Sequence, residues 1–544
     1  MVKTINLTGS EIKVTELGGD NTEIFNNGSG IIYASKLPNI TVGGDDVIAI
    51  PAGAIDGLYG THGTIYLLGT GGVELRGVDH MITKTRGQAM AVGGGISENY
   101  VDEKCNEILD IAKTYADVKD SEVIVSVKEY ADSLNAELAG YIGYTDNDIY
   151  GLEADFENNK FTRLAGAVGK TAGADFDGVN AYGGRRRCNL SDSGEVLAYY
   201  GDENFRIDGS NGQVMVEQPK FYYRAVPLKT EKIDGTDGYH LRKARYYISD
   251  TPRAGFKIHP AFICSGIEVD RIYLSAFEGC VYDTSESKYL LNDEQAADFN
   301  NDKLSSIAGA KPCSGTSQSL TRYNARKLAN NRGNGWGQAN IMSISATQLL
   351  FIIEYAAFNS QNVIGVGAVR KADDGRSNLA EVSGTTAILG NSSGKVSNSA
   401  NVEFISYRGE ENIWGNIWKW IDGVNEYNPT SQAGSFGTVF VSESVESDRY
   451  CDTGIHPEIG SGYISSFGYS EKYDFLFIPT EYKGTSAVPV GDVMLNVNGG
   501  TLAFMFGGAS YSSYNAGIFY TDFNITENLR SHIIGARLVF SRAS

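Results

Sequence analysis

The sequence predicts a multidomain protein of mainly β and α+β structure, in which a small β domain and a large mixed domain flank a helical coiled coil. The chain has 544 residues and 42% hydrophobic content, which is enough for several domains with their own cores. It contains 65 glycines but only 11 prolines, a balance typical of tight turns between short strands. One stretch, residues 97–138, has neither glycine nor proline, and it predicts a long helix.

Residues 1–90 predict a small all-β domain. Short runs of strand-forming residues alternate with turn pairs such as Asn27-Gly28 and Gly43-Gly44. The strand candidates are residues 31–34, 46–50 and 63–68. We find no catalytic grouping in this segment, and by analogy with small β domains at the start of long chains we expect a docking module.

Residues 97–140 predict a coiled-coil helix, with Ser97 as N-cap and Gly140 just after the end. Apolar positions follow one another at alternating spacings of four and three, as a coiled-coil seam requires. These positions are Val101, Cys105, Ile108, Ala112 and Tyr115, then Val123, Val127, Tyr130, Leu134 and Leu138. A stripe this narrow needs a partner, and identical chains are the simplest one. The alternative is a helix pair that packs on its own domain.

Residues 141–544 predict one large domain of short strands with few helices, since no linker-like break divides them. Two helices are expected, near residues 319–330 and at residues 345–357. The strand candidates are residues 213–216, 221–223, 271–274, 439–441 and 475–478.

Charge and composition exclude several functions. The net charge of −20 argues against a nucleic-acid partner. No stretch approaches about 18 consecutive apolar residues and the start has no apolar leader, so neither membrane insertion nor a signal peptide is expected. The six cysteines form no CxxC pair and the six histidines have no ligand spacing, so we expect no metal and no cofactor.

Two local patterns resemble ligand-binding sites: an acidic segment similar to a calcium loop, and a run of three arginines. The segment from Asp146 to Glu157 matches a calcium loop at positions 1, 3, 6 and 12, but Tyr150 stands at position 5. Calcium binding there stays open beside a simple polar turn. The basic run Arg185-Arg186-Arg187 predicts an inter-subunit salt bridge rather than nucleic-acid binding.

The end of the chain combines two core-like strands with a polar loop. Residues 502–506 and 536–540 are apolar runs, and a Tyr, Ser and Asn cluster lies between them. Tyrosine gives large, stiff contact area, and serine and asparagine give adaptable hydrogen bonds. The pattern favours a binding loop on a rigid β frame, although an ordinary surface loop has the same composition.

Five motifs, in this order, resemble the C-type-lectin-like fold of the formylglycine-generating-enzyme family and the receptor-binding domains of phage tail-fibre and tropism-determinant proteins. They are Gly335-Trp336-Gly337, residues 345–355, residues 415–423, Gly507-Gly508 and residues 535–539. The resemblance covers about residues 162–544. The enzyme branch binds copper through a close cysteine pair, whereas this chain has only Cys451 after Cys313, so we expect no enzyme.

The resemblance implies where a receptor would bind. The residues expected to contact it are Tyr511, Ser512, Ser513, Tyr514, Asn515, Tyr520 and Asp522. Gly507, Gly508, Gly535 and the Trp418/Trp420 pair would be scaffold.

The expected function is that of a homotrimeric phage-type tail fibre, or receptor-binding protein, located in the virion. Its residues 1–90 would contact other tail or baseplate proteins, residues 97–140 would trimerise, and residues 141–544 would hold a protein or glycan receptor on the host. One alternative is a tail-associated carbohydrate-processing enzyme, which needs two facing carboxylates. Another is a bacterial surface lectin or adhesin, against which the missing signal peptide counts.

Overall fold

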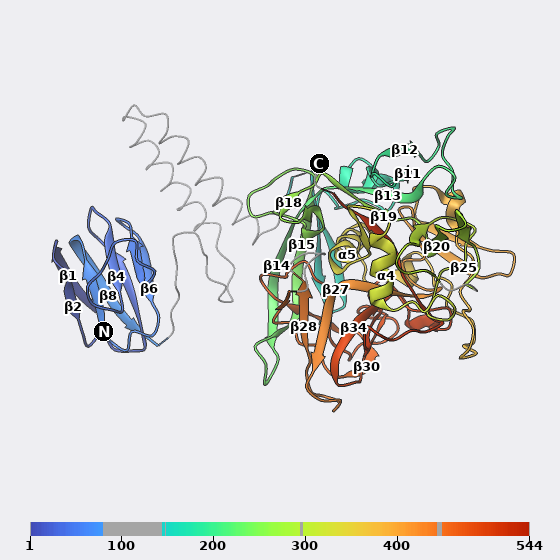
Figure 1. Cartoon of the computed structure of the whole chain (residues 1–544). Coiled ribbons are helices and arrows are strands. Elements are labelled where there is room, and N and C mark those ends of the chain that lie inside the picture. Colours follow the sequence, from blue (N-terminus) through green and yellow to red (C-terminus); the bar gives the residue numbers. More distant parts are fainter. Residues whose placement is uncertain (1, 80–143, 147, 294–296, 443–448, 543–544) are drawn as a thin grey trace. The chain divides into compact units, whose positions relative to one another are not determined.

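The structure is a computed structural model of the whole chain (Figure 1). It describes residues 2–79, 144–146, 148–293, 297–442 and 449–542. The chain divides into two compact units, Met1–Glu137 and Leu138–Ser544, and each is described by itself. The coiled coil predicted for residues 97–140 lies outside the described residues.

The described part of the first unit contains two four-stranded sheets around one apolar core. The first sheet has the order β1 (Val2–Thr8), β8 (Thr70–Val78), β3 (Asn21–Asn26), β6 (Ile55–Leu58). The second has the order β2 (Ile12–Val14), β7 (Ile65–Leu68), β4 (Ile32–Ser35), β5 (Val47–Ile50). Every second side chain of β3 is buried, as expected for a strand with one face on a core. All three predicted strands of this region are confirmed.

Three large sheets build the second unit, so the prediction of mainly β structure is confirmed. A seven-stranded sheet has the order β10 (Lys160–Ala165), β9 (Ile149–Asp155), β15 (Tyr239–Ser249), β14 (Tyr222–Lys232), β16 (Lys257–Ile258). In the same sheet β31 (Ser466–Tyr469) pairs with β15, and β32 (Pro479–Glu481) pairs with β31. A six-stranded sheet has the order β12 (Val196–Tyr199), β11 (Arg186–Leu190), β13 (Gln213–Pro219), β19 (Arg271–Ser275), β37 (Leu538–Phe540), β23 (Trp336–Gln338).

The eight-stranded sheet carries most of the C-terminal motifs. Its order is β29 (Tyr450–Asp452), β28 (Thr438–Ser442), β27 (Trp418–Asn428), β34 (Gly500–Phe506), β35 (Thr521–Ile525), β33 (Val493–Asn496), β30 (Gly460–Tyr463), and β36 (Ile534–Gly535) pairs with β27. Smaller sheets are formed by β17 (Ile263–Cys264) with β18 (Ile267–Glu268), by β21 (Lys288–Leu290), β20 (Gly279–Asp283) and β22 (Lys303–Ser306), and by β24 (Gly394–Ser397), β25 (Glu403–Tyr407) and β26 (Glu410–Glu411).

Short helices connect these sheets. The α-helices of the described residues are α3 (Asn180–Gly183), α4 (Arg322–Asn330), α5 (Ile341–Tyr355) and α6 (Ser360–Val363). The 3-10 helices are η1 (Ala174–Phe176), η2 (Pro260–Phe262), η3 (Thr385–Leu389) and η4 (Ser513–Asn515). Two of them, α4 and α5, are the helices that the sequence predicts.

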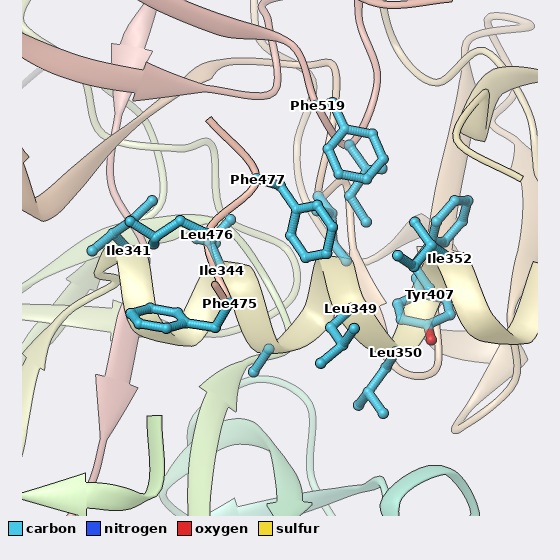
Figure 2. Close-up of a cluster of buried hydrophobic side chains, with 14 of the residues drawn as sticks. Ile341, Ile344, Leu349, Leu350, Ile352, Tyr407, Phe475, Leu476, Phe477 and Phe519 are labelled. Carbon is cyan, nitrogen blue, oxygen red and sulfur yellow. The ribbon is translucent and has the colours of Figure 1, made fainter. Parts of the chain in front are cut away.

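Helix α5 forms the centre of the second unit's core (Figure 1). Thirteen of its 15 residues are buried, and apolar side chains from several elements surround it (Figure 2). The helix begins four residues before the predicted start, because Asn340 and Ser343 form a capping box there. Because nearly every position of α5 is buried, its apolar residues face the core on all sides, as is typical of a fully enclosed helix.

The strand predicted at residues 475–478 is wrong. Residues 476–478 have no regular structure, and Phe475, Leu476 and Phe477 are buried near α5 (Figure 2). Ile478 is buried in the same apolar cluster. A continuous apolar run does not distinguish a buried strand from an irregular segment whose side chains all enter a core.

The basic run at 185–187 pairs within its own chain, which corrects the inter-subunit prediction. Arg185 forms a buried ion pair with Glu410, and Arg186 lies 3.6 Å from a carboxylate oxygen of Glu217. Arg187 is fully buried and donates hydrogen bonds to backbone carbonyls. Arg185 and Arg187 therefore join the start of β11 to residues 386–410, and Arg186 bridges β11 to β13.

The calcium loop considered for residues 146–157 is not formed. Strand β9 occupies the middle of the segment and separates Asp146 and Asp148 from Glu157. The two aspartates face Arg253, and Glu157 accepts hydrogen bonds from the Lys229 ammonium at 2.7 Å. The carboxylates are therefore paired with cations at opposite ends of a strand.

Candidate binding surface

A double-glycine turn after β34 opens the C-terminal loop. Gly507 and Gly508 have φ values of 86° and 80°, a region that favours glycine. A Cβ atom on Gly508 would lie 2.8 Å from a ring carbon of Tyr520, so only glycine fits this approach. Trp418 and Trp420 are buried beside the turn in one apolar cluster. These residues occupy the scaffold positions that the sequence predicts for them.

Backbone hydrogen bonds fix the loop at residues 509–516 to a second loop that begins at Val369. The Lys371 amide donates to the Ser510 carbonyl at 2.7 Å, and the Ser513 amide donates to the Val369 carbonyl at 2.8 Å. The Gln361 amide group donates to the backbone carbonyl of Tyr514 at 2.7 Å. Most of these bonds do not depend on loop side chains, so the backbone is held while the side chains project.

Tyr514 is the most exposed aromatic residue of the predicted contact set, with 52% of its surface accessible. The Arg370 guanidinium donates a hydrogen bond to its hydroxyl at 2.6 Å. The same guanidinium lies 5.0 Å from the ring centroid, within the range of a cation–π contact. Ser513 is exposed beside the ring. The pair presents a stiff aromatic surface with a positive charge next to it.

Tyr511 and Asn515 are half-buried at the edge of this surface. The Tyr463 hydroxyl donates to the side-chain oxygen of Asn515 at 3.0 Å, which orients the amide. Burial raises the pKa of Tyr511, and a hydrogen bond with Trp418 opposes part of that rise. Both residues offer part of their side chain to a partner and use the rest for packing.

Three members of the predicted contact set are buried, which corrects the expectation that they are exposed. The Ser512 hydroxyl accepts the Ala509 amide at 2.9 Å and so closes the turn. The ring of Tyr520 packs on Trp418 with centroids 4.5 Å apart. Asp522 is 7% exposed, and its carboxyl accepts the Asn524 amide at 2.7 Å. The sequence showed that these residues were polar or aromatic but not which way they point.

Burial sets the ionisation of Asp522. Removal of its carboxyl from water raises its pKa to about 7, and the Asn524 amide opposes part of that rise. Tyr511 and Tyr520 both lie close enough for its charge to raise their pKa values. Asp522 therefore belongs to the support beneath the surface, with a charge state that changes near neutral pH.

The surface also contains residues that sequence reasoning missed. Arg370 is 144 residues from Tyr514 along the chain, and nothing in its local sequence marks it. Asp373, Asp374 and His532 offer ligand atoms within 4.8 Å of one another, and His532 Nε2 lies 2.9 Å from Asp373 Oδ1. This set could hold a metal ion, and a charge on Asp373 raises the pKa of Tyr511. Their spacing in sequence gave no ligand motif.

Within the described residues, no helix combines the length and the apolar character needed to cross a membrane. The five described cysteines form no disulfide with one another.

Comparisons with known proteins complete the description of the site. No protein-family model matches the chain, and no curated protein matches it. Among solved structures, the "Major Tropism Determinant U1 Variant" is similar, with 12% identity and a TM-score of 0.22. The I1 and P3c variants align with 11% and 10% identity and TM-scores of 0.23 and 0.21. Each alignment covers 65% of this chain and 71% of the other. TM-scores this low do not indicate the function of this chain.

Proposed function

We propose that this chain is the receptor-binding protein of a phage-type tail fibre, located in the virion, and that it attaches the particle to a bacterial surface receptor. The observation that carries the proposal is the exposed pair of Tyr514 and Arg370 on two loops that backbone hydrogen bonds hold together. Tyrosine and arginine are the residues that most often dominate binding energy at interfaces. The motif resemblance to receptor-binding domains of tail fibres supports the same function.

The proposed binding needs no chemical step. Tyr514, Ser513 and the accessible parts of Tyr511 and Asn515 provide ring faces, hydroxyls and an amide. Such groups form shallow contacts with a protein or a glycan. Three copies on one particle would bind a cell surface far more tightly than one copy, because the later binding events are intramolecular. Residues 97–140 would supply the homotrimer, and residues 1–90 would contact other tail or baseplate proteins.

Binding to cells tests the surface. Fluorescently labelled protein is incubated with a panel of bacterial strains, and bound fluorescence is measured by flow cytometry. Tyr514→Ala and Arg370→Ala should each weaken binding by tenfold or more, since an anchor residue contributes about 2 kcal/mol per site. Tyr427→Ala is the matched control, because Tyr427 is 49% exposed but lies on β27, outside both loops. All three variants should keep the wild-type melting temperature.

Two results would contradict the proposal. If the wild-type protein binds no strain of a broad panel, the chain is not a receptor-binding protein for those hosts. If Tyr514→Ala and Arg370→Ala bind as the wild type does, the contact surface lies elsewhere. Release of sugars from host polysaccharide by the wild-type protein would favour the alternative of a carbohydrate-processing enzyme.

Mass measurement in solution tests the assembly. The wild-type protein should be a trimer at micromolar concentration. Ile108→Asp and Tyr130→Asp together should yield monomers, because a charge in a buried seam costs several kcal/mol. A monomeric wild-type protein would contradict the coiled-coil prediction.

A further inference from the structure

A second site lies at the N-terminal end of α5. A cavity of about 740 Å³ is bounded by α4, by the start of α5, by β17 and by strands β23 and β27. This volume falls in the range of small-molecule sites. None of the contact residues proposed above lines it. Strand β27 contributes Trp418 to the apolar cluster beneath Tyr520 and Asp422 to the cavity, so one strand carries both features.

An irregularity in β27 directs a carboxylate to the cavity wall. The pairing of β27 with β34 is interrupted between Trp420 and Asn425, and Asp422 lies in this interruption. Breaks of this kind re-aim side chains and often occur at functional sites. Arg326 of α4 donates from Nε to Asp422 Oδ2 at 2.6 Å and from Nη2 to the other oxygen. The two opposite charges cancel, so the wall is polar but has no net charge from this pair.

A buried amide at the same wall lacks a partner. Gln338 of β23 is fully buried and lines the cavity. Its amide nitrogen donates to the Trp420 carbonyl at 2.9 Å, while its Oε1 has no hydrogen-bond partner among the described residues. Because this oxygen has no exposed surface, it is part of the cavity wall and offers no contact to a ligand.

Polar and apolar groups share the remaining wall. Asn330 and Asn334 are exposed at its edge, and amides offer both donors and acceptors. Ile263 is 47% exposed and Met342 is half-buried on the lining, and both are apolar. A ligand that matches this wall has many hydroxyl groups and an apolar C–H face.

We propose that this cavity binds a neutral saccharide of one or two rings. The planar guanidinium of Arg326 and the exposed amides of Asn330 and Asn334 suit pairs of neighbouring hydroxyls, and the apolar residues suit the face of a sugar ring. The mutual pairing of Arg326 and Asp422 makes the site a poor match for an anion, which would compete with the carboxylate for the guanidinium. The site is independent of the Tyr514 surface, so it goes beyond the proposed function.

Ligand-observed saturation-transfer NMR on the full chain tests the proposal. The probes are glucose, galactose, mannose, N-acetylglucosamine and their common disaccharides at millimolar concentration, with inorganic phosphate measured by calorimetry. We expect saturable binding of at least one neutral sugar. Asn330→Trp should weaken that binding by tenfold or more, because an indole at this exposed edge fills the entrance. Asp422→Asn, which keeps the shape and removes the charge, should also weaken it.

Matched variants separate this site from the rest of the chain. Tyr323→Ala changes another exposed residue of α4, one that does not line the cavity, and should bind the sugar as the wild type does. Tyr514→Ala should also bind it normally, so failure of the receptor surface would not be mistaken for failure here. The proposal is overturned if none of these sugars binds, if phosphate alone binds, or if Asn330→Trp with a wild-type melting temperature keeps full sugar binding.

Discussion

Replacement of Asp522 by asparagine should stabilise the protein, and the gain should depend on pH. The carboxyl has an ordinary pKa of 3.8, and burial raises it to about 7 in the folded chain. Folding therefore favours the protonated form. Stability should fall as the pH rises from about 4 to about 7, because the unfolded chain loses this proton first, and it should change little above that range.

The magnitude follows from the two pKa values. A difference of about three units, at 1.36 kcal/mol per unit, corresponds to roughly 4 kcal/mol of destabilisation above neutral pH. Asparagine keeps an oxygen that can accept the Asn524 amide, which lies 2.7 Å from Asp522 Oδ1, and it does not ionise. Asp522→Asn should equal the wild type near pH 4 and exceed it by up to roughly 4 kcal/mol near pH 8.

Urea unfolding at a series of pH values measures this difference. All four tryptophans belong to the second unit, so their fluorescence follows the unit that contains Asp522. Asp234→Asn removes one negative charge at an exposed position and controls for net charge. A gain that stays constant across the pH range, or a variant that is less stable than the wild type near pH 8, would refute the assignment of a buried carboxyl that ionises near neutrality.

Three further substitutions of buried residues are checked by the same unfolding measurement. Tyr520→Ala removes a buried ring that packs on Trp418 and should cost about 3–5 kcal/mol, whereas a purely surface role predicts almost no change. Arg537→Ala removes the donor for two buried backbone carbonyls, at 2.7 and 2.6 Å, and should cost about 3 kcal/mol; wild-type stability would show that those carbonyls find other donors. Glu354→Gln removes the buried carboxylate partner of Arg408, which keeps only the exposed Asp177 at 2.9 Å, and should cost about 3 kcal/mol; a small effect would mean that Asp177 and water compensate the cation.

Elements with a distinct periodicity or end signal could be predicted from the sequence, and elements defined by long-range packing could not. The apolar run before Gly507 predicted β34, because short strands between glycine turns leave a clear pattern. Helix α5 was predicted from its apolar content, but its start depends on the cap at Asn340, whose pairing with Ser343 only the structure shows. The run at residues 475–478 has the composition of a strand but forms an irregular segment, because all four side chains enter the core around α5.

The candidate site shows the same division. Tyr514 was predicted from loop composition, and the structure places it at the surface. Tyr520 and Asp522 follow closely in sequence, but the return into β35 turns both toward the interior. Composition does not indicate whether a side chain at a loop–strand boundary faces the solvent or the core. Arg370 comes from a distant loop that backbone hydrogen bonds bring alongside, and no local pattern reports such a contact.

The enclosed position of α5 has a consequence for how the second unit opens. The helix contacts β27 of the eight-stranded sheet and both β9 and β15 of the seven-stranded sheet. Neither sheet can separate from the helix without exposure of its apolar residues, so the two sheets and α5 should form one cooperative unit. Amide hydrogens in the middle of α5 should then exchange with solvent only through opening of this whole unit, while those of the exposed loop beside Tyr514 exchange through small local motions that leave the core closed.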